Sequence, residues 1–190
     1  MSTKSPAPYV SGPLILIGMI VLAALSRLLP HPPNFSPLEA VALFGGAYFA
    51  KRWMAFLVPM IALLVSDLAL GLINGGIYVE YYFSISFALV YACIALLTAM
   101  GLGLRGKAGV LRVAGYSVAG SLLFFLVTNF ASWLGSPMYP QTAAGLGAAY
   151  IAGIPFLQNT VLGTLFYSGV LFGGFAYLRR QHPVLRLQTA

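Results

Sequence analysis

Glu39, Asp67 and Glu80 are the only acidic residues in a chain of 190 residues. Asp67 interrupts the apolar run "LVPMIALLVSDLALGLI", residues 57–73. A carboxylate in such surroundings is costly unless it faces a partner or a polar cavity. Arg27, at the end of the first apolar run, is the candidate partner. The two residues predict either a structural ion pair between two helices or a ligand or cation contact through Asp67.

The stretch "LLPHPPNFSPLEAVALF", residues 28–44, places polar side chains between two apolar runs. Its prolines stop the first helix and favour a rigid, extended turn that carries His31 and Asn34. We interpret His31 either as a turn residue bonded to nearby backbone or as a contact to a ligand or metal. In "SPLE", Ser36 is suited to cap the next helix and Glu39 to reach back to the cap amide. Glu39 is accordingly interpreted as a capping residue or, alternatively, as a ligand contact.

Neutral polar residues recur in the last third of the chain. In "TNFASW", Asn129 and Trp133 are four residues apart and share one helix face. Asn129 is interpreted as an interhelical hydrogen-bonding residue or a ligand contact, and Trp133 as an anchor at the membrane interface. Tyr139 lies in "GSPMYPQT", an uncharged loop that is a candidate lid. Gln158 and Asn159 follow a proline and are suited to satisfy freed carbonyls or to bind a ligand.

Sequence motifs for catalysis or nucleotide binding are missing. The chain has no phosphate-binding loop, no zinc-protease motif and no nucleophile-elbow motif. Its single cysteine, Cys93, excludes an intrachain disulfide and a multi-cysteine metal site. We therefore expect a protein that is not an enzyme and holds no cofactor or metal. The alternative of a membrane enzyme requires Asp67, His31 and Cys93 to converge in space.

The composition indicates an integral membrane protein. Hydrophobic residues make up 60% of the chain and charged residues only 7%, against about 25% charged residues in a soluble domain. The net charge of +7 is explained by membrane topology, so no nucleic-acid partner is expected. Residues 1–190 form a single all-α transmembrane domain, because a bilayer gives backbone groups no water to bond. We predict six spans, at about 13–29, 37–50, 53–73, 79–100, 113–134 and 150–178.

The basic residues predict the orientation of these spans. Six alternating spans place nine of them on one side, and Arg27 alone on the other; the nine are Lys4, Lys51, Arg52, Arg105, Lys107, Arg112, Arg179, Arg180 and Arg186. Both termini are therefore expected in the cytoplasm, with the protein in the inner (plasma) membrane. The acidic and amide side chains then gather at the outer side. This grouping predicts a pocket that opens to the outside. The candidate ligand contacts are His31, Asn34, Glu39, Asp67, Asn129, Trp133, Tyr139, Gln158 and Asn159.

Five stretches carry a resemblance to a known family; they are "SRLLPHPPNFSPLEAVALFGGAYF", "LVPMIALLVSDLALG", "FFLVTNFASWL", "MYPQTAAGL" and "IPFLQNTVLGTLFYSGVLFGG". They resemble a family of small bacterial membrane proteins that is labelled as transport proteins of unknown function. That family in turn resembles the substrate-binding S components of energy-coupling-factor vitamin importers. The resemblance implies a six-helix bundle with an outward-facing pocket. The nearest functional analogue is the BtuM-type cobalamin S component, whose cobalt-ligating cysteine has no outer counterpart here.

The preferred hypothesis is a membrane subunit that binds a small organic nutrient, such as a vitamin or its precursor, for uptake. Because the chain lacks an ATP site, release inside is expected to need an ATP-driven energising module. An alternative is a structural or assembly subunit without a small ligand. The small residues Ala42, Gly46 and Ala50 would permit close helix packing, either within the chain or against a partner.

Overall fold

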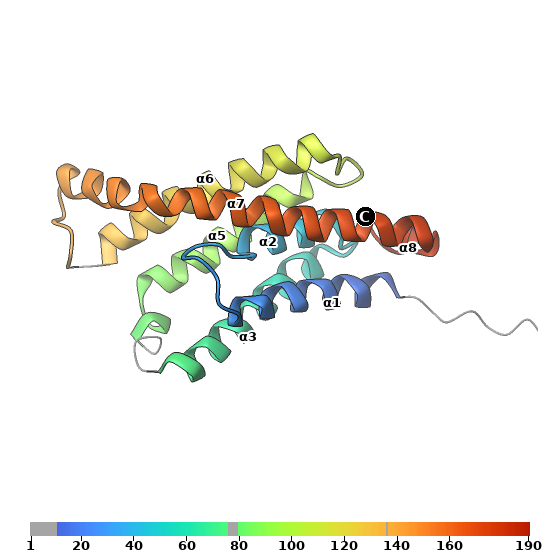
Figure 1. Ribbon diagram of the computed structural model, residues 1–190, viewed down its shortest axis with the longest axis horizontal. Coiled ribbons are helices and arrows are strands. Elements are labelled where there is room, and N and C mark those ends of the chain that lie inside the picture. The colour runs from blue at the N-terminus through green and yellow to red at the C-terminus, as the bar shows by residue number, and fades with distance from the viewer. Residues whose placement is uncertain (1–10, 76–79, 136) are drawn as a thin grey trace, which may run out of the picture.

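The computed structural model describes residues 11–75, 80–135 and 137–190, and these residues contain helices and no strand (Figure 1). The helices are α1 (Gly12–Leu25), the 3-10 turn η1 (Ser26–Leu28), α2 (Leu38–Tyr48), α3 (Arg52–Asn74), α5 (Ile85–Leu102), α6 (Val110–Gly135), α7 (Ala143–Gln181) and α8 (Val184–Gln188). The all-α prediction is confirmed for the described residues.

Within the described residues, four helices are long and apolar enough to cross a membrane, namely α3, α5, α6 and α7. They contain 23, 18, 26 and 39 residues, and a span needs roughly 20 residues. The stretch Gly12–Leu28 and helix α2 are apolar but shorter. These four helices support a membrane protein, while the predicted number of six spans includes two segments below that length.

Helix α2 is the centre of the bundle. Every residue from Leu38 to Tyr48 is buried, and the helix contacts α1, α3, α5, α6 and α7. In Figure 1 it lies between the layer of α1 and α3 and the layer of α6 and α7. A helix of 11 residues is only about 16 Å long. The bundle therefore surrounds a helix that reaches across only part of its length.

Glycine allows α2 to approach its neighbours at backbone distance. A Cβ atom added to Gly46 would stand 2.9 Å from the backbone of Gly101 on α5 and closer still to the carbonyl oxygen of Thr98. A Cβ added to Gly45 would stand 2.5 Å from the Pro59 ring on α3. The close helix packing expected at Gly46 is therefore found within the chain.

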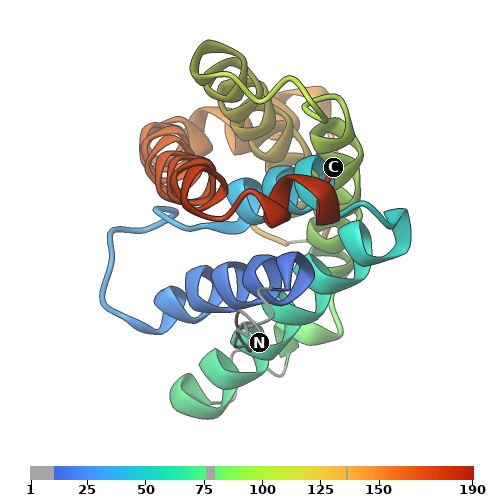
Figure 2. The same ribbon diagram turned by 90° about the vertical axis from the view of Figure 1, so that its right-hand side faces the viewer.

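The two ends of the bundle differ in charge. At one end, the backbone amide of Gly12 donates to the Gln188 side chain, and the amide of Ala190 donates to the Tyr48 carbonyl. The start of α1 and the C-terminal α8 therefore lie together, as Figure 2 shows. The loops at 49–51 and 103–109 lie at the same end in Figure 1. We call this the basic end, because all the described Lys and Arg residues except Arg27 lie in or near these segments.

Some helix ends differ from those predicted. Helix α5 starts at Ile85 rather than 79, because the Ser84 side chain accepts a hydrogen bond from the Phe87 amide and caps it; residue 79 lies outside the described residues. Helix α7 starts earlier than 150, because Thr142 caps it through the Gly145 amide. The predicted Ser36 cap of α2 is wrong: Pro37 occupies the cap position, without a side-chain cap bond.

Gly46→Ala is expected to destabilise the protein by about 1–3 kcal/mol, because the added methyl group meets the α5 backbone rather than a movable side chain. The thermal midpoint of the detergent-solubilised protein measures this loss. Gly18→Ala on α1 is the matched control, since a Cβ there meets nothing within 4 Å and should leave the midpoint unchanged or raise it. Equal midpoints for both variants would contradict the close α2–α5 contact.

Candidate functional site

The segment from Leu29 to Pro37, which we call the lip, runs from the end of η1 to the start of α2. The Asn159 side chain on α7 donates a hydrogen bond of 2.9 Å to the Pro33 carbonyl. A Cβ added to Gly163 would stand 2.9 Å from the Ser36 amide nitrogen, so the lip backbone lies directly on α7. Asn34 has a φ of 61°, the left-handed conformation that Asn tolerates better than most residues. The predicted rigid turn is thus fastened to α7 by backbone contacts.

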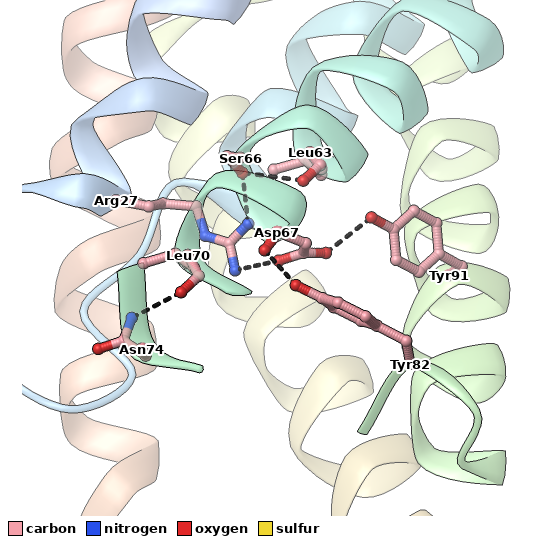
Figure 3. Close-up of polar contacts among 8 residues, drawn as sticks. All are labelled: Arg27, Leu63, Ser66, Asp67, Leu70, Asn74, Tyr82 and Tyr91. Atoms are coloured by element: carbon pink, nitrogen blue, oxygen red, sulfur yellow. Dashed lines mark hydrogen bonds and ion pairs between the residues drawn. The ribbon is translucent and has the colours of Figure 1, made fainter. Parts of the chain in front are cut away.

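Arg27 and Asp67 form an ion pair just beneath the lip (Figure 3). Arg27 Nη2 lies 2.7 Å from Asp67 Oδ1, and Arg27 Nη1 donates to the Ser66 hydroxyl at 2.6 Å. The Tyr91 hydroxyl donates to Asp67 Oδ2 at 2.7 Å. The two side chains are 14% and 10% exposed. Both oxygens of the Asp67 carboxylate therefore have partners within the protein.

Two adjoining pockets open beside this ion pair. The smaller, of about 310 Å³, is lined by Arg27, His31, Asn34, Glu39 and Asp67, among others. The larger, of about 420 Å³, is lined by residues of α5, α6 and α7, among others, and none of the described residues in its wall is charged. Asn34, Tyr81, Val90 and Phe124 line both pockets. Together they form one polar-and-aromatic site at the end of the bundle opposite the basic end, within the size range of small-molecule sites.

The larger pocket contains two of the predicted neutral residues, Asn129 and Tyr139. The Asn129 amide group donates to the Phe125 carbonyl of its own helix, and a Cβ on Gly153 of α7 would collide with it. Glycine at position 153 thus makes room for the Asn129 side chain in the pocket wall. The sequence did not single out Thr128 and Thr160, which also line this pocket, because hydroxyl residues are frequent in apolar helices and carry no distinctive pattern.

The structure does not bring Trp133, Gln158 or Asn159 to the wall of either pocket. Trp133 Nε1 donates to the Pro140 carbonyl, and Gln141 donates to the Trp133 carbonyl, so Trp133 closes the α6–α7 loop. Gln158 lies exposed on the outer surface of α7. Asn159 bonds the lip instead. Their grouping with the pocket residues in the sequence did not fix which way each side chain turns.

His31 is exposed, and its Nδ1 lies 3.0 Å from the neighbouring Pro32 carbonyl. It lines the smaller pocket together with Asp67. Cys93 is fully buried and lines neither pocket. Among the described residues, no three His, Cys, Asp or Glu side chains gather closely enough to hold a metal. Cys93 is thus separated from the other two residues of the alternative enzyme hypothesis.

The glutamate at the start of α2 lies in the wall of the smaller pocket. Glu39 is 1% exposed, and the Thr164 side chain on α7 interacts with its carboxyl. Below it, buried hydroxyls join α6 to α7: Ser121 donates to Thr164, and Ser117 donates to Ser168. These bonds fix the rotation of α7 about its axis, and therefore which of its faces lies against Glu39 and the lip.

Comparison with known proteins places this arrangement in a family. Residues 10–185 match the model of the "Family of unknown function (DUF6580)". This chain belongs to that family. No curated protein and no solved structure matches it. The prediction of a family without a known function is confirmed, whereas the likeness to vitamin-importer S components finds no support in these comparisons.

In this DUF6580 chain, Arg27→Met should lower stability by about 3–5 kcal/mol, because it leaves the buried Asp67 carboxylate without its counter-charge. Arg27→Met combined with Asp67→Asn should recover much of that loss, since no buried charge is left alone. Thermal unfolding in detergent measures both, with Lys107→Met at the exposed basic end as the control. A single variant as stable as the double variant would refute a buried, coupled pair.

Proposed function

We propose that this protein is a membrane-embedded subunit that binds a small organic nutrient, such as a vitamin or its precursor, for uptake into the cell. The observation that carries the proposal is the pair of adjoining pockets beneath the lip, which combine a charged lobe with an uncharged, aromatic lobe. Such pockets, with a few polar groups in apolar walls, suit small ligands. The subunit binds its ligand and does not transform it.

The proposed orientation has the basic end in the cytoplasm and the lip end outside. Cytoplasmic loops of membrane proteins are enriched in Lys and Arg, and Lys51, Arg105 and Lys107 lie in loops at the basic end. In this proposal the chain passes the membrane six times, with α1 and α2 completing the count although they are short. Both termini are then cytoplasmic, and the pockets open outward in the inner (plasma) membrane.

The proposed transport cycle starts with capture of the ligand from outside. The lip around His31 and the loop around Tyr139 close over it, and both residues line the site. Reorientation of the bundle then releases the ligand inside. Because the sequence contains no phosphate-binding loop, the energy is supplied by an ATP-driven partner. This cycle is the one expected of an S component, and the S-component likeness is part of the proposal.

The proposed function is tested by native mass spectrometry of the full chain in mild detergent. A discrete small-molecule adduct is expected for the wild type and for Gln158→Ala, whose side chain lies outside both pockets. Asn129→Ala should weaken the adduct about tenfold, because a pocket amide contributes roughly 1.5 kcal/mol or less through its hydrogen bonds. A clean mass for the wild type that no vitamin shifts would favour the alternative of an assembly subunit.

The proposed orientation is tested by labelling with a membrane-impermeant maleimide on intact cells. A cysteine at Glu80, which is exposed near the lip end, should react from outside. A cysteine at Lys107, exposed at the basic end, should react only after the membrane is made permeable. Cys93 is fully buried, so the parent chain provides the unlabelled control. Labelling of Lys107→Cys on intact cells would contradict the proposed orientation and indicate the opposite one.

A further inference from the structure

Glu39 is a charged side chain whose bonding is incomplete. Its Oε2 is the one buried side-chain oxygen or nitrogen, within residues 11–75, 80–135 and 137–190, that has no hydrogen-bond partner. Buried polar groups are almost always paired, and a buried charge without a partner costs more than a neutral group. A native structure that keeps such an oxygen in a pocket wall calls for an explanation.

The side chains around Glu39 already have other hydrogen-bond partners. The Thr164 hydroxyl has one proton, and it donates that proton to the Thr160 carbonyl. The Arg27 guanidinium is already bonded to Asp67 and Ser66. A donor in the pocket, from water or from a ligand, would complete the bonding of Oε2.

The charge of the site indicates what kind of donor this is. The charged side chains that line the two pockets, among the described residues, are Arg27, Glu39 and Asp67. Arg27 and Asp67 neutralise each other at 2.7 Å. Glu39 is therefore the acidic side chain of the site that has no ion-pair partner within the described part of the chain. A ligand with one positive charge would supply that partner on binding.

We propose that the ligand is a small organic cation whose protonated amine donates a hydrogen bond to Glu39. This inference rests on the proposed function and names the chemical class of its substrate. The amine lies in the smaller pocket, and the rest of the ligand extends past Tyr81 and Phe124, which line both pockets, into the larger pocket. Aromatic faces along that path also attract a cation.

The position of Glu39 on α2 supports this role. Glu39 lies in the first turn of the helix, where the helix dipole stabilises a negative charge. Glu39 is only 1% exposed, yet it lines the smaller pocket, where the amine would meet its carboxylate. The carboxylate then exchanges an unsatisfied state for a charge-assisted hydrogen bond.

The test uses the purified full chain and matched pairs of probes. Tryptamine and tyramine carry a protonated amine, whereas indole-3-ethanol and 4-hydroxyphenylethanol replace it with a hydroxyl group. Both amines should raise the thermal midpoint of the wild type, and the alcohols should not. In Glu39→Gln, which keeps the size of the side chain, amine affinity should fall at least tenfold. Glu80→Gln is the matched control, since Glu80 is exposed and lines neither pocket.

The comparison of amine with alcohol is made on the wild type, so it stands even if Glu39→Gln folds poorly. Equal binding of amines and alcohols overturns the cation inference and leaves the proposed function intact, as does a neutral adduct in native mass spectrometry. Stabilisation by NaCl over KCl that depends on Glu39 also overturns it, in favour of an inorganic cation. If none of the four probes shifts the thermal midpoint, the cation inference is overturned. If native mass spectrometry also shows no adduct, the proposed function is overturned as well.

Discussion

The burial of α2 is the constraint on which the rest of the structure depends. A helix surrounded by five others cannot rely on water to satisfy its ends. At its C-terminal end, Arg105 donates to the Gly46 and Phe49 carbonyls, and the Ala190 amide donates to the Tyr48 carbonyl. The basic loop and the end of the chain thus complete the hydrogen bonding of the central helix. The cation at this end also complements the helix dipole.

The same constraint explains the close packing and the buried polar groups around α2. Glycines at Gly46 and Gly101 let its backbone meet that of α5, which gains van der Waals contact where lipid provides no hydrophobic drive between helices. Hydroxyl pairs such as Ser121 and Thr164 join α6 to α7 on the other side. The Arg27–Asp67 pair links η1, which follows α1, to α3, and the Tyr91 hydroxyl links α5 to Asp67. Each neighbour of α2 is therefore tied to a second neighbour.

Because α2 is short, the bundle has room for a site at the lip end. Its first turn, with Leu38 and Glu39, lines the smaller pocket, and the lip above it is attached to α7. Helix α2 thus presents the positive end of its dipole and an acidic side chain to a space that a longer helix would fill. The proposed binding of a small cationic nutrient rests on the acidic side chain, and the basic end faces away from it.

The sequence by itself determined that this chain suits a membrane and that it is helical, because both follow from its composition. It also determined the clustering of basic residues at one end and the stiffness of the proline-rich lip. It also pointed to Arg27 and Asp67, since one carboxylate in an apolar run has few possible partners. Only the tertiary structure decided how each helix is rotated about its axis, and therefore which side chains face the site. Gln158 lies outside the site, Asn159 holds the lip, and Glu39 lies in the pocket wall rather than capping α2 with Ser36. The physical reason is that a helix apolar on all sides has no polar face to show its rotation, so packing against its neighbours sets it.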